Sequence, residues 1–373
     1  MNRPLLFTPW QLPSATLANR IMVSPMCMYS ATDGLAGSFH RLHLGTLSQS
    51  GAGLLVVEST AVSPGGRISP NCLGLWNDAQ ETALARVIGD LRAHSPIRFG
   101  IQLSHSGRKG SRLVTMPSGS RALTEAEGAW QGVGPSAIAY SRRYPVPQEL
   151  DLAGMRAIRG AFAAAARRAA RAGFGAVELH GGHGYLLHAF RAPNSNRRTD
   201  GYGGDCANRN RFPREVAEAV RDALPPGCIL GYRLNGEDWH PEGVTLEESI
   251  ALAGDLRRVG VDYVTTSGGA GSPGISPPPV TPGYMAHFAA AVRNQTGIDS
   301  VAVGMILSGR QAEELLQDGC ADAVAIGRGM LDDPRWAHHA AAQMGCELAA
   351  LPQYAKSSSS NWPGYRIVHG TGA

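Results

Sequence analysis

The sequence predicts an α/β protein with a single (β/α)8 barrel (TIM barrel), and three observations support this. Eight short apolar runs recur along the 373 residues, and their unbroken apolar character is typical of strands buried on both faces. Helical stretches separate many of the runs, as the crossovers of a parallel sheet require. The length suits an undivided barrel. A doubly wound sheet is the competing fold, but no G-x-G-x-x-G motif follows the first predicted strand.

The predicted strands and helices follow one another along the chain. The strands are 21–23, 53–58, 99–103, 174–179, 229–234, 261–266, 301–304 and 323–327. The helices, assigned from helical spacing of apolar residues, are 151–172, 208–224, 245–259, 282–296 and 308–317. Thr245 with Glu248 three residues later forms a capping-box pattern, and Ser308 is placed to cap the last of these helices.

Two regions fall outside the repeat of strands and helices. Residues 104–149 are rich in Gly, Ser and Pro and are too long for an ordinary connection, so we expect a lid that caps the barrel mouth after strand three. Residues 356–373, which begin with Lys356 and a run of four serines, are expected to form a C-terminal tail. The predicted organisation is therefore one barrel over residues 1–355, with its lid at 104–149, followed by the tail.

Composition and charge narrow the class of protein. Hydrophobic residues make up 43% and charged residues 17% of the chain, as in ordinary globular domains. The net charge of +4 is small and the basic pairs are scattered, so we expect no nucleic-acid partner. The sequence contains no run of 18 apolar residues, so we expect no membrane span. The six cysteines include no C-x-x-C pair, which argues against a zinc ribbon or an iron–sulfur cluster, and a cytoplasmic location is the default expectation.

The segment His180–Tyr185 is the strongest candidate for catalysis, because two imidazoles and a phenol emerge together where the fourth strand ends. Two neutral donors can polarise a carbonyl or phenolate oxygen, and a nearby tyrosine can deliver a proton. A zinc pair or a buried core histidine is the alternative interpretation. His180 and His183 have no acidic residue or cysteine in the same turn, so we expect no metal there.

The ends of the other predicted strands carry polar residues that would meet at the mouth of a barrel. They are Ser24, Pro25, Met26, Cys27 and Tyr29 after strand one, Ser59 after strand two, Gln102 in strand three and Arg233 in strand five. Gly304, Gly327 and Arg328 follow strands seven and eight, where barrels usually bind a phosphate. A phosphate together with Gln102 and Arg233 suggests flavin mononucleotide, FMN, because Arg233 would place positive charge near N1 of the flavin.

Several long motifs in a common order resemble those of the old yellow enzyme family of flavin-dependent ene-reductases, in its bacterial branch with a cysteine near the flavin. The resemblance runs from about residue 5 to residue 354. Its motifs are Asn19–Arg20, Ser24–Tyr29, Gln102–Lys109, His180–Tyr185, Ser195–Gly204 and Ile326–Arg328.

The resemblance implies a role for each matching residue. FMN would be held by Ser24, Pro25, Met26, Cys27, Ser59, Gln102, Arg233, Gly304, Gly327 and Arg328. His180 and His183 would bind the activating oxygen of a small-molecule substrate, with Cys27 and Tyr29 at its edge, and Tyr185 would donate a proton. Hydride would pass from NADPH or NADH through FMN to the β-carbon of an enone, maleimide or nitroalkene.

Four positions depart from the family pattern. Gly181 and Gly182 stand where relatives usually carry residues such as alanine, so added backbone freedom is expected to loosen the second histidine. Arg191 adds a charge with no evident partner. Lys356 stands where close relatives have an arginine that reaches a neighbouring subunit, and lysine lacks the planar fork of arginine. A homodimer or higher homo-oligomer is expected.

Two other functions remain open from the sequence. A flavin-dependent desaturase would run the same hydride path in reverse on the same scaffold. A flavin-free, phosphate-binding barrel enzyme is the other alternative, although an aldolase would need a lysine at a strand end and none of the predicted strands supplies one.

Overall fold

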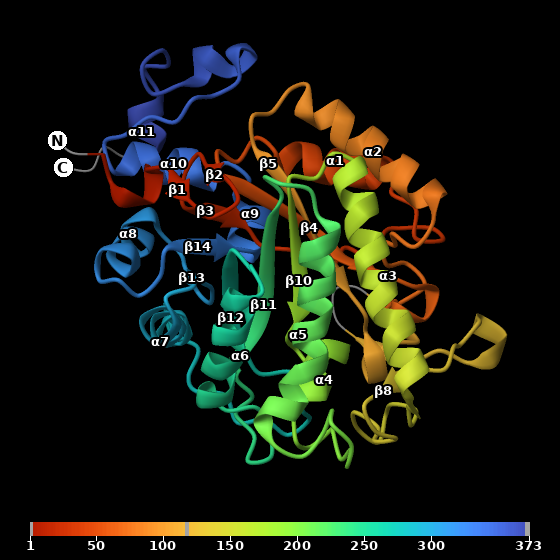
Figure 1. Ribbon diagram of the computed structural model, residues 1–373. Helices are drawn as coiled ribbons and strands as arrows, with labels where there is room; N and C mark the ends of the chain where they lie inside the picture. The colour runs from red at the N-terminus through yellow and green to blue at the C-terminus, as the bar shows by residue number, and fades with distance from the viewer. Residues whose placement is uncertain (1–2, 116–118, 370–373) are drawn as a thin grey trace.

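A computed structural model describes residues 3–115 and 119–369 and shows a closed barrel of eight parallel strands (Figure 1). The strands are β3 (Ile21–Val23), β4 (Leu54–Ala61), β5 (Arg98–Ser104), β10 (Ala176–Gly181), β11 (Ile229–Glu237), β12 (Tyr263–Gly268), β13 (Asp299–Ala302) and β14 (Ala323–Ile326). They neighbour one another in chain order, and β14 pairs with β3 to close the barrel. The predicted (β/α)8 fold is confirmed.

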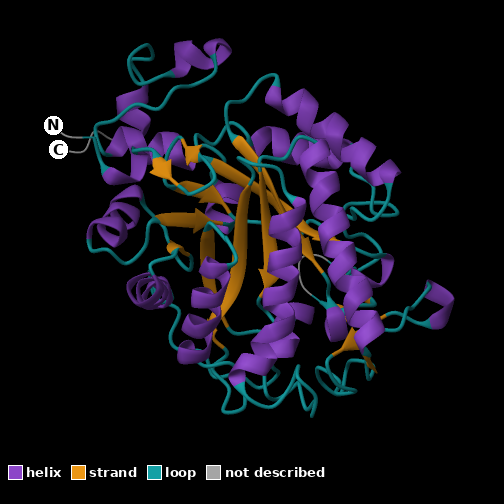
Figure 2. Ribbon diagram, viewed as in Figure 1, coloured by secondary structure: helices purple, strands orange, loops and turns teal. Residues whose placement is uncertain are grey.

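Helices form the outer layer around the strands (Figure 2). Between successive strands lie α1 (Ser38–Leu47), α2 (Asp78–Arg92), α3 (Leu152–Arg171), α4 (Leu186–Arg191), α5 (Cys206–Ala223), α6 (Leu246–Arg258), α7 (Ala286–Thr296) and α8 (Gly309–Gln317). The predicted caps are confirmed, since the hydroxyl of Thr245 accepts the Glu248 N–H at 3.4 Å and that of Ser308 accepts the Gln311 N–H at 3.2 Å. The sequence analysis missed α1, α2 and α4.

The predicted lid contains short irregular elements. In its described part these are η3 (Gly107–Lys109), β6 (Arg112–Val114), β7 (Ser120–Ala122), η4 (Glu125–Glu127), β8 (Val133–Gly134) and β9 (Gln148–Glu149). Trp130 anchors this segment to the loop after β4, because its indole N–H donates to Gly65 O at 3.2 Å and the Arg67 guanidinium lies 4.8 Å from its ring. Residues 116–118 of the predicted lid lie outside the described residues.

The chain after β14 leaves the barrel. It forms α9 (Arg328–Asp332), α10 (Trp336–Gln343), η5 (Pro352–Ser357) and α11 (Tyr365–His369). Figure 1 shows η5, in blue, standing away from the barrel, and Lys356 within it is exposed. Residues 1–2 of the predicted barrel and 370–373 of the predicted tail lie outside the described residues.

The alternation of side chains along each strand creates two layers of core. In β10, Ala176 packs inside the barrel, whereas Val177 and Leu179 face the helices. The hairpin of β1 (Trp10–Gln11) and β2 (Thr16–Leu17) closes the base of the barrel. Trp10 is 1% exposed, lies 5.6 Å from the Tyr263 ring and donates its indole N–H to Asp299 at 2.8 Å.

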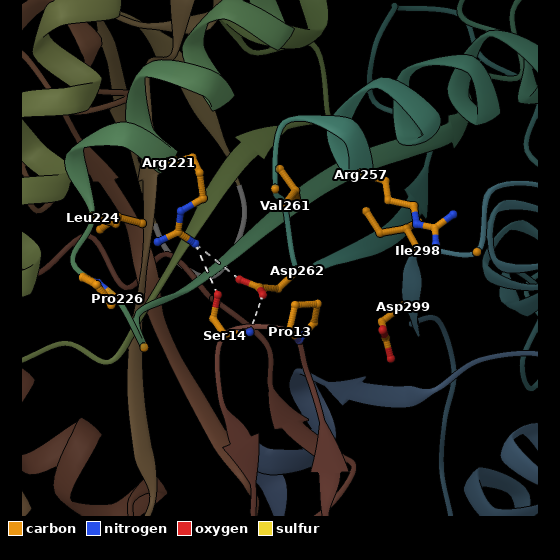
Figure 3. Close-up of a pocket in the computed structure, with 13 residues that line it drawn as sticks. Pro13, Ser14, Arg221, Leu224, Pro226, Arg257, Val261, Asp262, Ile298 and Asp299 are labelled. Atoms are coloured by element: carbon orange, nitrogen blue, oxygen red, sulfur yellow. Dashed lines mark hydrogen bonds and ion pairs between the residues drawn. The ribbon is translucent and has the colours of Figure 1, made fainter.

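A surface pocket lies at this same base, beside the starts of β12 and β13 (Figure 3). Its central carboxylate, Asp262, accepts the backbone N–H groups of Ser14 at 2.9 Å and Leu230 at 2.7 Å, and lies 3.5 Å from Arg221. These contacts fasten the hairpin to the barrel. The pocket therefore belongs to the structural end of the barrel, since sites in this fold lie at the carboxyl ends of the strands.

Replacing Trp10 with alanine should lower the free energy of unfolding by about 3–5 kcal/mol, because it empties the base of the barrel and leaves Asp299 without its donor. Urea unfolding followed by tryptophan fluorescence and by circular dichroism measures the change. Trp10→Phe keeps most of the apolar volume and should lose less than half as much. Equal stability of Trp10→Ala and the parent would contradict this account of the barrel base.

Candidate functional site

Strand β10 carries His180 inward at the carboxyl end of the barrel, where it is 5% exposed. The Gly182 N–H donates to Nδ1 of His180 at 3.3 Å, so the ring proton lies on Nε2, which is left free to donate. Burial lowers the pKa of His180 well below its usual range, and the charge of Arg233 adds to this effect. His180 is thus a neutral hydrogen-bond donor at neutral pH.

His183 follows in a tight turn with a left-handed backbone, φ +58°. Its ring lies 5.2 Å from that of His180 between centroids and nearly perpendicular to it, at 83°. Nε2 of His183 is 3.1 Å from the Ser267 hydroxyl, which leaves Nδ1 for a ligand. Burial, followed by the charge of Arg233, lowers the pKa of His183 well below its usual range. The second imidazole is therefore neutral as well.

Tyr185 completes the cluster at the N-terminus of α4. Its ring centroid lies 4.8 Å from that of His180, with an interplanar angle of 89°. Among the described residues its hydroxyl has no hydrogen-bond partner, so the phenol is available to a ligand. Burial raises the pKa of Tyr185 well above its usual range, with Cys27 and Tyr29 adding to the effect. The hydroxyl therefore stays protonated at neutral pH.

A buried network holds the turn between the two histidines and the tyrosine. Asn235 accepts the His183 N–H at 3.1 Å and donates to Asp238 at 2.7 Å. Asp238 also lies 2.9 Å from Nε2 of His188, whose Nδ1 accepts the Gly184 N–H at 3.2 Å. Burial acts to raise the pKa of Asp238, but His188 and Asn235 outweigh it and hold that pKa at about 2. The anionic carboxylate fixes the turn from below.

The two glycines in the turn are required by packing. A Cβ at Gly181 would lie 2.1 Å from Cε1 of Tyr232, and a Cβ at Gly182 would lie 2.7 Å from Oδ1 of Asn235. The structure thus gives both glycines a packing role, and the expectation that they loosen the second histidine stays a prediction. Arg191 also has partners: its Nη2 donates to the Ser249 hydroxyl at 2.9 Å and its Nε to Asn210 Oδ1 at 3.3 Å.

The inner wall below the histidines contains a carboxylate that the sequence analysis missed. Glu178 is 1% exposed and accepts hydrogen bonds from Gln102 Nε2 at 2.8 Å and from the Thr265 hydroxyl at 2.9 Å. Gln102 therefore keeps its amide oxygen free for a ligand. Burial raises the pKa of Glu178, and Arg233 partly offsets this. A glutamate inside an otherwise apolar strand was the available signal, since such a group needs partners.

Arg233, in the middle of β11, is a cation of the site. Its Nε is buried and has no hydrogen-bond partner among the described residues. Burial lowers its pKa, whereas Glu178, Cys27 and Tyr185 act to raise it. An unpaired guanidinium nitrogen in a buried wall indicates a place for a polar or anionic ligand.

The loop after β3 brings Ser24, Pro25, Met26, Cys27 and Tyr29 to the same end of the barrel. Glu58 of β4, also missed by the sequence analysis, anchors this loop by accepting the Met28 N–H at 3.0 Å. Burial raises the pKa of the Cys27 thiol, and Glu58 adds to the effect, so the thiol stays protonated. Burial likewise raises the pKa of Tyr29. Ser59, next to Glu58, is buried in β4.

The predicted phosphate-binding residues lie after the last two strands. Gly304 has φ +103°, a conformation that favours glycine. A Cβ at Gly327 would lie 3.5 Å from Met26 Sδ and 3.7 Å from Ser24 Cβ, so the loops after β14 and β3 are adjacent. Arg328 is exposed and, within the described residues, forms no hydrogen bond or ion pair through its guanidinium. These groups are free to meet an anion.

Among the described residues, no group of three or more His, Cys, Asp or Glu side chains could hold a metal ion, so His180 and His183 have no third such ligand there. No helix among them is sufficiently long and apolar to span a bilayer.

The chain matches known proteins over most of its length. Residues 5–347 match the model of the NADH:flavin oxidoreductase / NADH oxidase family. An NADPH dehydrogenase from Geobacillus sp. (strain WCH70) is 39% identical over 352 residues, which cover 94% of this chain and 97% of the relative. One from Listeria monocytogenes serovar 1/2a (strain EGD-e) is 39% identical over 354 residues, covering 94% and 98% of the two chains.

The chain is also similar to solved structures over most of its length. Morphinone reductase is 30% identical with a TM-score of 0.76, and the match covers 93% of this chain and 91% of that one. An old yellow enzyme homologue from Zymomonas mobilis is 25% identical with a TM-score of 0.71, covering 89% and 90% of the two chains.

Fold and site together define a barrel oxidoreductase with polar groups at its strand ends. The chain belongs to the NADH:flavin oxidoreductase / NADH oxidase family, and its relation to the old yellow enzymes is confirmed. The protein is a flavoenzyme that uses FMN and takes reducing equivalents from NADPH or NADH. The flavin-free barrel enzyme considered from the sequence is therefore wrong.

The packing of Gly181 against Tyr232 can be measured with a double-mutant cycle. Gly181→Ala should cost about 1–3 kcal/mol of unfolding free energy, because the new Cβ would overlap the Tyr232 ring. Tyr232→Val should cost about 2–4 kcal/mol by opening a cavity. The double variant should lose at least 1 kcal/mol less than the sum, since valine leaves room for the methyl group. Additive losses in urea unfolding would contradict the proposed contact.

Proposed function

We propose that this flavoenzyme reduces the C=C bond of alkenes activated by a carbonyl or nitro group, such as enones, maleimides and nitroalkenes. The observation that carries the proposal is the cluster of two neutral imidazole donors and a protonated phenol at the barrel mouth. The chemistry that bound FMN supplies is hydride transfer, from the nicotinamide and on to the β-carbon of the alkene. Desaturation, the reverse reaction, would use the same residues.

The residues at the strand ends fit FMN. The unpaired Nε of Arg233 and the free amide oxygen of Gln102 suit the polar edge of the flavin ring. Arg328, without a partner among the described residues, suits a phosphate beside Gly304 and Gly327. We assign Ser24, Pro25, Met26, Cys27 and Ser59 to the same cofactor site.

The two histidines would bind the oxygen of the activating group. Nε2 of His180 is free to donate, and Nδ1 of His183 would donate in the tautomer whose Nε2 accepts from the Ser267 hydroxyl; burial keeps both rings neutral. Negative charge grows on the substrate oxygen as hydride arrives at the β-carbon, and fixed donors stabilise that charge most strongly. Cys27 and Tyr29 would border the substrate as a neutral thiol and phenol.

Tyr185 would give its hydroxyl proton to the α-carbon. Its raised pKa keeps the proton on oxygen until a strongly basic carbon forms, and its position beside His180 places it next to the bound oxygen.

We also propose a homo-oligomer. An apolar groove lies between α1 and the segment before η5, and Leu42 and Tyr354 at its edges are 72% and 50% exposed. A second copy of this chain would cover such a groove. Light scattering of the full chain tests the assembly, and truncation after Tyr354 tests the part played by Lys356.

The cytoplasmic location stays a prediction.

The double variant His180→Ala/His183→Ala should retain FMN but lose the oxyanion donors. Anaerobic stopped-flow mixing of the reduced holoenzyme with 2-cyclohexen-1-one should show flavin reoxidation slowed at least ~100-fold, as for loss of an oxyanion-hole donor. His94→Ala, at an exposed position, serves as the matched control. Reoxidation at the parent rate would overturn the assignment of the histidines.

Tyr185→Phe should slow reoxidation by the enone about 100-fold, because general acid catalysis is lost. Ferricyanide, which takes electrons without forming a C–H bond, should reoxidise the variant at the parent rate. Reduction of the same sample by NADPH and by NADH, measured separately, establishes the preferred nicotinamide. An unchanged enone rate would show that the proton comes from elsewhere.

A further inference from the structure

Lys109, at the end of η3, carries a cation into the site that no step above uses. Its Nζ donates to the carbonyl oxygen of His183 at 2.7 Å and to that of Ala270 at 3.0 Å. Within the described residues it forms no ion pair with a carboxylate. The ammonium group is therefore held by the histidine turn on one side and by the loop after β12 on the other.

Two phenol rings complete the surroundings of Lys109. Nζ lies 4.3 Å from the ring centroid of Tyr140 and 5.4 Å from that of Tyr185. Both distances are within the range in which a cation is attracted to an aromatic face. The Tyr140 hydroxyl donates to Ala270 O at 3.3 Å, the same carbonyl that Lys109 binds. The tyrosine assigned to proton donation thus has a fixed cation at its ring.

We propose that Lys109 is a positioning residue for proton transfer, whose ammonium group stabilises the phenolate that Tyr185 becomes when it protonates the substrate. This inference rests on the proposed function of Tyr185. In the step, the Tyr185 O–H bond breaks and its proton forms the C–H bond at the α-carbon of the substrate anion. The electron pair of the O–H bond stays on the phenolate oxygen until a proton from water replaces the lost one. The positive charge of the nearby ammonium group stabilises the negative charge that the ring acquires.

The protonation of Lys109 makes the step dependent on pH. Burial lowers the pKa of Lys109 to about 7, Arg108 acts in the same direction, and Asp238 opposes them. The other titratable groups near it are Tyr140, Tyr185 and the neutral imidazoles of His180 and His183, whose pKa values its charge helps to lower. Lys109 is cationic below this pKa and neutral above it. Enone-dependent reoxidation should therefore slow as the pH rises through about 7.

The test compares Lys109→Met and Lys109→Arg with the parent holoenzyme, reduced anaerobically and mixed with 2-cyclohexen-1-one from pH 5.5 to 9. At low pH, Lys109→Met should react about tenfold more slowly than the parent, and its rate should no longer change near neutral pH. Lys109→Arg should restore a fast rate that persists at high pH, since arginine stays charged. Reduction by NADPH and reoxidation by ferricyanide should be unchanged in both variants.

A matched control separates the charge from the anchoring of the loop. Tyr140→Phe removes the second hydrogen bond to Ala270 O but keeps the ammonium group at the Tyr185 ring. It should react at close to the parent rate and retain the pH dependence. If Lys109→Met matches the parent while Tyr185→Phe is slow, the inference about Lys109 is overturned and the proposed function stands. If Tyr185→Phe is also fast, both fall.

Discussion

The buried carboxylate of Glu178 connects the packing of the barrel to the chemistry at its mouth. It faces the barrel interior and accepts hydrogen bonds from Gln102 of β5 and Thr265 of β12, so three strands meet at one buried carboxyl group. A carboxylate removed from water costs several kcal/mol unless such partners surround it. The same contacts turn the amide oxygen of Gln102 toward the space above and leave Arg233 as a neighbouring cation. One buried carboxyl group therefore links three strands of the barrel to residues proposed to hold the cofactor.

The alternation of side chains along β10 places the first histidine on the same face of the strand as Glu178. Glu178 and His180 face the interior, and the intervening Leu179 packs outward. The chain must then reverse sharply, with positive φ at both His183 and Gly184, which is a strained conformation for a histidine. The network of Asp238 and its partners stabilises that turn. The histidine pair is consequently held by strand geometry on one side and by buried hydrogen bonds on the other.

The sequence predicted most of the barrel because its strands are short apolar runs, which periodicity detects. It missed α2 although Asn77 and Gln80 form a capping pattern, and Asn77 does accept the Gln80 N–H at 2.9 Å. Site residues at strand ends were also predictable, since closure of a parallel barrel gathers those ends. Contacts between side chains on different strands were not predictable. The packing of Gly181 could not be predicted because the ring that fills its space belongs to Tyr232, about fifty residues later, and only the register of β10 with β11 brings the two together.

Burial also determines which groups at the mouth carry charge. It keeps both imidazoles, the Cys27 thiol and the phenols of Tyr29 and Tyr185 neutral. Arg233 nevertheless remains cationic, because its basicity is too high for burial to neutralise it. The carboxyl groups of Glu58 and Asp238 are occupied in anchoring loops. The mouth therefore offers neutral donors and positive charge. In the proposed alkene reduction, electron density would move onto the acceptor oxygen, and this distribution would favour the transition state over the neutral substrate.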